Sequence, residues 1–145
     1  MKKITLFLLI ALCPIMLIAQ EKHSPQDLKV LRRIISLNPH LDRLNPVQIG
    51  TQIWNNGRLT YLNLFSERIS VLPSNIGDLT GLVYLNLELN QLSDLPYSIG
   101  DLISLEELYL SDNMLVELPT SIGGLINLEE LYLSNNQLTN VPESL

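Results

Sequence analysis

The stretch "LEELYLSDN" at residues 105–113 returns almost unchanged as "LEELYLSNN" at residues 128–136, with the two starts 23 positions apart. Two earlier stretches keep the same spacing, because "LTYLNLFSE" starts at Leu59 and "LVYLNLELN" starts at Leu82. Four units therefore follow one another at a 23-residue period. A fixed period of this length indicates a repeat architecture, in which each unit is one supersecondary element.

Each unit places leucine at its first, fourth and sixth positions. Apolar and polar residues alternate around these leucines, which predicts a short strand with one buried face. Stacked units would pair their strands and bury one continuous column of leucines. An apolar residue followed by proline comes later in each unit, and three units continue with Ile-Gly. Proline is expected to turn the chain there, and glycine to allow the backbone geometry needed to return to the next strand.

The ninth position of three units is asparagine, at Asn90, Asn113 and Asn136. An asparagine amide both donates and accepts hydrogen bonds, so we expect it to satisfy backbone groups where the coil bends after the strand. The first unit has Glu67 at this position. Its contact there is expected to differ.

The pattern resembles the leucine-rich repeat in its 23-residue form, LxxLxLxxNxLxxLPxxIGxLxx, over residues 59–145. The resemblance implies an α/β solenoid with parallel strands on a concave face and short helical or 3₁₀ turns on the convex face. Family members usually bind other macromolecules, most often proteins, on the concave face. Repeats with LPxxIG are similar to those of bacterial and plant proteins.

Residues 1–20 have the layout of an export signal, with Lys2 and Lys3 ahead of an apolar run from Ile4 to Ala19. The run is shorter than the roughly 20 residues that span a membrane. It therefore predicts a signal peptide cut after Ala19 or Gln20, with a retained anchor or a lipid on Cys13 as alternatives. Cys13 is the only cysteine, so a cleaved chain would have none. This favours a secreted or cell-envelope protein exported by a bacterium over an animal extracellular protein.

Residues 21–58 are predicted to form an N-terminal cap made of a helix and a hairpin strand. Ser24 is placed to cap the helix, and Asp27 lies where the acid of a capping box would be. An apolar stripe would cover the exposed end of the solenoid and consists of Leu28, Leu31, Ile34 and Ile35. Asn38-Pro39 should end this helix.

The polar side of the helix carries Lys29, Arg32 and Arg33, which could contact a partner or lipid headgroups. The simpler interpretation is that the helix serves only to cover the end of the solenoid with its apolar stripe. Further along, Asn56-Gly57 predicts a hairpin that pairs residues 51–54 with residues 58–61. Trp54 is expected to pack over the end of the leucine column.

Charge is divided unequally along the chain. Residues 59–145 hold one arginine against twelve acids, whereas residues 21–58 carry a net charge of +3. An acidic solenoid excludes nucleic acid as a partner and argues against docking on an anionic membrane, so a membrane role depends on retention of the N-terminal segment. A basic protein partner is compatible with this charge, which also maintains solubility.

Side chains between the buried leucines should point outward from the concave face. Tyrosine offers a large contact area at low entropic cost, although it also suits strands for reasons of packing alone. The predicted binding residues are Tyr61, Asn63, Phe65, Tyr84, Asn86, Glu88, Glu107, Tyr109, Glu130 and Tyr132.

No catalytic constellation, cofactor motif or metal-ligand spacing is found, and the paired acids at residues 106–107 and 129–130 recur with the repeat. The sequence therefore predicts a non-enzymatic protein-binding scaffold. The alternatives are a carbohydrate-binding surface on which the tyrosines stack sugars, and a non-autonomous fragment of a longer repeat protein. The fourth repeat is truncated at Leu145 without a terminal cap, so its leucines would need a partner, further sequence or a second copy to cover them. The last of these alternatives would make the protein a dimer.

Overall fold

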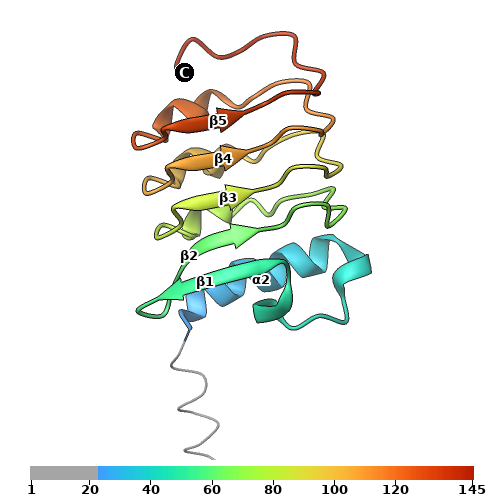
Figure 1. The fold of residues 1–145 in the computed structure, drawn as a ribbon, viewed down its shortest axis with the longest axis vertical. Helices are drawn as coiled ribbons and strands as arrows, with labels where there is room; N and C mark the ends of the chain where they lie inside the picture. Colours follow the sequence, from blue (N-terminus) through green and yellow to red (C-terminus); the bar gives the residue numbers. More distant parts are fainter. Residues whose placement is uncertain (1–22) are drawn as a thin grey trace, which may run out of the picture.

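The computed structural model describes residues 23–145, so the predicted export signal lies outside the described residues. Figure 1 shows a single column of stacked coils, with α2 (Pro25–Leu37) and β1 (Thr51–Asn55) at one end and β5 (Glu130–Tyr132) near the other. The strands between are β2 (Arg58–Asn63), β3 (Tyr84–Asn86) and β4 (Glu107–Tyr109). The 3₁₀ turns are η1 (Pro39–Leu41), η2 (Pro46–Gln48), η3 (Ile76–Asp78), η4 (Tyr97–Asp101) and η5 (Thr120–Gly124).

The five strands form one sheet in chain order, antiparallel between β1 and β2 and parallel from β2 to β5. The parallel strands pair in register, so the fourth-position leucines occupy one rung. Leu62, Leu85 and Leu108 are fully buried, and the equivalent Leu131 of the last repeat is half-buried. The solenoid of parallel strands backed by 3₁₀ turns is therefore confirmed. Each repeat covers apolar side chains of the neighbouring repeat, as expected when the core forms by stacking of repeats.

The Ile-Gly glycines serve close packing between turns. A Cβ atom built on Gly100 would collide with the backbone oxygen of Ser121 in the next turn, and one on Gly77 would meet that of Ser98. Neither glycine has a positive φ angle of the kind that side chains avoid. The expectation that glycine supplies an unusual backbone conformation here was wrong. Its missing side chain lets successive 3₁₀ turns touch.

The ninth-position asparagines form a hydrogen-bonded ladder inside the bend after each strand. The Asn113 Oδ1 accepts from the Leu92 N–H at 3.0 Å, and its Nδ2 donates to the carbonyls of Leu87 at 2.8 Å and Leu110 at 3.0 Å. Asn90 and Asn136 make the equivalent bonds one repeat before and one repeat after. Each amide thereby joins two repeats.

Glu67 of the first repeat does not take part in this ladder through its side chain. Buried Asn38, at the end of α2, reaches this bend instead. Its Oδ1 accepts from the Ser70 N–H, and its Nδ2 donates to the Val71 carbonyl, both at 2.9 Å. Asn38 therefore ties the end of the cap helix to the first repeat, just beyond the bend.

Helix α2 begins as predicted, because the Ser24 Oγ accepts from the Asp27 N–H at 3.3 Å. The Asp27 side chain, however, makes no capping-box bond back to Ser24. It is fully buried, accepts from the Leu59 N–H at 2.8 Å and forms an ion pair with Arg58 at 3.0 Å. Asp27 thus ties the helix to the start of β2. The apolar stripe also differs by one residue, since Val30 is fully buried and Leu28 only half-buried.

The hairpin between β1 and β2 is confirmed, but its pairing extends further than predicted, to Thr51 opposite Asn63, because the register shifts between Ile53 and Trp54. Asn56 has φ 49° and Gly57 has φ 79°, the positive values that a two-residue hairpin turn with matching twist requires. Trp54 packs against the core, as expected, with its ring edge-on to His23 at 4.4 Å between centroids. Among residues 23–145, no helix is both long and apolar enough to cross a membrane.

Candidate functional site

The outward positions of β2 to β5 form aligned rows because the strands pair in register. The third-position row contains Tyr61, Tyr84, Glu107 and Glu130, and the fifth-position row contains Asn63, Asn86, Tyr109 and Tyr132. Repeats one and two therefore carry tyrosine followed by asparagine, whereas repeats three and four carry glutamate followed by tyrosine. Tyrosine therefore lies in the third-position row on β2 and β3 and in the fifth-position row on β4 and β5.

The four tyrosines nevertheless form one continuous stack. Tyr61 and Tyr84 are parallel with ring centroids 4.2 Å apart, and Tyr109 and Tyr132 are parallel at 4.6 Å. The diagonal step between Tyr84 and Tyr109 is bridged by tilted rings at 5.2 Å. These spacings lie in the range of favourable aromatic pairs. Each ring is therefore held in place by its neighbours, and an ordered aromatic surface crosses the sheet.

Hydrogen bonds fix the tyrosine hydroxyls in two different ways. In the first two repeats, Asn63 and Asn86 donate their side-chain amides to the hydroxyls of Tyr61 and Tyr84 at 3.5 Å and 3.3 Å. Asn86 is only 6% exposed, so this predicted binding residue positions Tyr84 and cannot offer a broad contact of its own. The asparagine amides thus help to orient the tyrosine rings of the first two repeats.

In the last two repeats the tyrosines are the donors. The Tyr109 hydroxyl donates to Glu107 at 2.9 Å and lies 3.4 Å from Glu130, and the Tyr132 hydroxyl donates to Glu130 at 2.9 Å. Two carboxylates and two hydroxyls therefore form a connected network across β4 and β5. Carboxylate acceptors make the stronger class of hydrogen bond, which orients these rings further.

The same contacts perturb the tyrosine titrations. The hydrogen bond to Glu107, followed by loss of hydration and the nearby carboxylates, raises the pKa of Tyr109 well above 10.0. The hydrogen bond to Glu130 is the main cause that raises the pKa of Tyr132, whereas burial is the main cause for Tyr84. The raised pKa values keep these hydroxyls protonated, and therefore able to donate hydrogen bonds, to higher pH than in a free tyrosine.

A shallow hollow of about 570 Å³ adjoins the first half of the stack. It is lined by Asn55, Thr60, Tyr61, Val83, Tyr84 and Glu107. Concave hollows with a few polar groups are where ligands bind preferentially.

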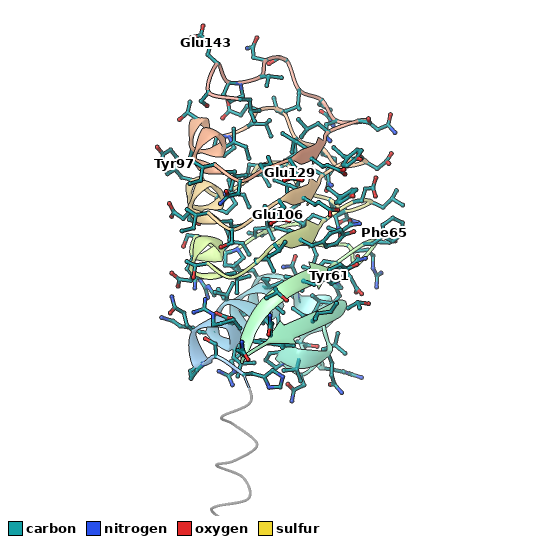
Figure 2. All side chains as sticks on the ribbon, turned by 60° about the vertical axis from the view of Figure 1, so that its left-hand side comes forward. Tyr61, Phe65, Tyr97, Glu106, Glu129 and Glu143 are labelled. Carbon is teal, nitrogen blue, oxygen red and sulfur yellow. The ribbon has the colours of Figure 1, made fainter. Side chains whose placement is uncertain are left out.

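The rim of the concave face, beyond the strand ends, carries two exposed apolar side chains. Phe65, labelled in Figure 2, and Leu89 are each 48% exposed. Leu89 has φ 54°, in the left-handed region, and the matching residues of the other repeats are Ser66, Asp112 and Asn135 with similar angles. Asparagine and aspartate tolerate this conformation, whereas for leucine it is strained. Sequence reasoning missed Leu89, and the polar residues of its sister repeats were the available signal.

Glu88 and the seventh-position serines complete the face, and Glu106 and Glu129 lie exposed at its edge, where Figure 2 shows them one above the other. Within residues 23–145, no group of three or more histidine, cysteine or acidic side chains could hold a metal ion. The site is thus built from aromatic rings, amides and carboxylates.

A family model described as a leucine-rich repeat region matches residues 12–145. The chain belongs to the leucine-rich repeat family. Among solved structures, a leucine-rich repeat protein of Leptospira interrogans is 43% identical over 59% of this chain, with a TM-score of 0.58. The crystal structure of PEPR1–AtPEP1 is 27% identical over 83% of this chain, with a TM-score of 0.69. No curated protein matches the chain.

The chain spans about a fifth of the length of both solved relatives, covering 22% of the first and 19% of the second. Their likeness therefore supports the leucine-rich repeat architecture and its repeat type. The function of a longer protein does not follow from this likeness.

Proposed function

We propose that this chain is a non-enzymatic, protein-binding scaffold that recognises its partner with the tyrosine stack of the concave face. The observation that carries the proposal is the continuous, hydrogen-bonded row of four rings on β2 to β5. Rigid tyrosines lose little entropy on binding and are enriched where proteins meet. Exposed Phe65 and Leu89 at the rim would add apolar contact area.

The stack geometry favours a protein over a carbohydrate. Sugars bind to the open faces of aromatic rings, but Tyr84 and Tyr109 each have a tyrosine neighbour on both sides. Only Tyr61 and Tyr132, at the two ends, have a side without a ring partner in the stack. The inner rings offer edges and hydroxyls, which suit the backbone and side chains of a polypeptide.

A basic partner matches the charge of this surface. Glu107 and Glu130 project from the face, with Glu88, Glu106 and Glu129 around them. Complementary charge speeds association and sets the register of binding more than it adds affinity. The same charge opposes nucleic acid.

We also propose that residues 1–20 export the protein to the cell envelope or medium, that residues 21–58 cap the solenoid, and that residues 59–145 form its repeats. Retention of the N-terminal segment would anchor the protein in a membrane. The half-exposed leucines of the fourth repeat, Leu128, Leu131 and Leu133, would favour a dimer. Light scattering at rising concentration checks this point, and a strictly monomeric mass would contradict it.

The proposal is tested by selecting binders from a phage-displayed peptide library and from a glycan array, then measuring their affinities for variants. Tyr84→Ala and Tyr109→Ala should each lower the affinity for a selected peptide about tenfold or more, as loss of an aromatic anchor does. Tyr97→Ala is the matched control, because Tyr97 is 71% exposed and lies in η4, away from the strands.

Circular dichroism would first establish that all three variants fold. Equal affinities in all three would reject the tyrosine stack as the binding site. Selection of glycans alone, with binding lost in the two concave-face variants, would replace the protein partner by a carbohydrate.

A further inference from the structure

A second hollow lies away from the concave face, between α2 and the turn that leads into η3. Its volume is about 420 Å³. Helix α2 is drawn behind β1 in Figure 1, on the side of the 3₁₀ turns. The helix contributes Lys29, Arg32, Arg33 and Ser36, and the turn contributes Ser74 and Asn75.

The three cations of this groove have no acidic partner in the described chain. Within residues 23–145, the one ion pair joins Arg58 to Asp27, on the buried side of the helix. Lys29, Arg32 and Arg33 are exposed, and none of their side-chain nitrogens makes a hydrogen bond to residues 23–145. Asp78, near the groove, accepts from the Asn75 amide at 3.2 Å instead.

Helix stability does not account for these positions. Cations stabilise a helix in its last turn, but the last turn of α2 contains no basic residue. Lys29 lies three residues before Arg32 and four before Arg33, and like charges at these spacings repel each other. Repulsion within the cluster therefore destabilises the helix slightly. The repeats that follow, residues 59–145, carry one arginine against twelve acids.

We propose that this groove binds a phosphate group. Two guanidinium groups and one ammonium supply the charge, and arginine's planar donors match phosphate oxygens in pairs. The Ser74 hydroxyl, on the facing wall, has no hydrogen-bond partner within residues 23–145 and adds a neutral donor. The open shape admits a phosphate that is free, on a small molecule or on a lipid headgroup. The acidic repeats repel anions generally, so binding would be confined to this groove.

The test uses the full chain and inorganic phosphate, titrated at constant ionic strength and followed by ¹H–¹⁵N NMR. Saturable shifts are expected at Lys29, Ser74 and Asn75. Arg32→Gln/Arg33→Gln should weaken the apparent affinity about tenfold or more, because it removes the charge-assisted bonds. Arg43→Gln/Arg68→Gln removes the same charge elsewhere and should leave the titration unchanged. The absence of saturable shifts, or equal weakening in both double variants, would overturn the proposal.

Sedimentation with vesicles identifies the source of the phosphate. Vesicles of phosphatidylcholine with phosphatidic acid would be compared with phosphatidylcholine alone, using the same two double variants. Sedimentation that depends on Arg32 and Arg33 assigns the phosphate to a lipid headgroup. Saturable phosphate binding without such sedimentation assigns it to a soluble ligand.

Discussion

Replacement of Asn113 by alanine should lower the free energy of unfolding by about 3 kcal/mol. The Leu92 N–H would lose its acceptor, the Asn113 Oδ1 at 3.0 Å, and Asn113 is only 7% exposed, so water does not readily replace it. A buried donor without a partner costs about 1–3 kcal/mol.

The three carbonyls that Asn113 contacts are affected less, because each keeps a second donor. Leu87 O still accepts from Asn90, Leu110 O from Asn136, and Ser111 O from the Leu89 N–H. Their weakened bonds add about 1 kcal/mol in total. The orphaned N–H of Leu92 is therefore the larger part of the effect.

Asn136→Ala is the matched control, since it removes the same bonds from the last repeat. Asn136 is half-buried, so water can reach the vacated acceptor site, and the expected loss is about 1 kcal/mol. Urea unfolding followed by circular dichroism measures the stability of both variants. Unchanged m-values would show that the two free energies of unfolding can be compared directly. The reasoning is refuted if Asn136→Ala costs as much as Asn113→Ala.

Three further outcomes follow from individual contacts. Leu89→Asn should raise the free energy of unfolding by about 1 kcal/mol in urea melts, because asparagine tolerates φ 54°, and a destabilised variant would contradict the strain. Asp27→Ala should lower the free energy of unfolding by about 2 kcal/mol in the same assay, because the buried Leu59 N–H loses its acceptor and Arg58 loses its ion-pair partner. An unchanged unfolding midpoint would contradict this role of Asp27. Absorbance at 295 nm sums all five tyrosines, so the Tyr109 titration is the part of the signal that Tyr109→Phe removes. That part should ionise at higher pH in the folded protein than in the urea-unfolded chain, and Glu107→Gln/Glu130→Gln should reduce the difference. Since folding raises this pKa above 10.0, its contribution to stability is complete below that pH and disappears as pH rises through the folded value, so superimposable titrations would contradict it.

The repeat period predicted most of the fold because every unit obeys the same local rules. Leucine spacing established the strands and their register, and Asn56-Gly57 established the hairpin. The contacts of Asp27 and Asn38 escaped prediction, because their partners lie 31 to 33 residues away and belong to another element. A capping position in the sequence did not reveal which way the side chain would turn.

The candidate face was predicted as a set of outward positions, and the structure supplies its organisation. Alternation along a strand predicts which side a residue faces, but not whether Tyr84 and Tyr109 meet across two rows at 5.2 Å. It also does not predict that Asn86 is covered by its neighbours, or that Leu89 adopts a left-handed conformation. These features depend on side-chain packing between repeats.

The central claim, that the concave face binds a protein, is tested most directly by photo-crosslinking in cells that make the protein. A photoreactive phenylalanine derivative would replace Phe65 at the concave rim or Tyr97 in η4, two residues that Figure 2 shows on opposite sides of the molecule. Both side chains are exposed, and the control position is the more exposed of the two, at 71% against 48%. A discrete protein adduct is expected from position 65 and not from position 97. Adducts from position 97 alone, or the same adducts from both, would contradict it.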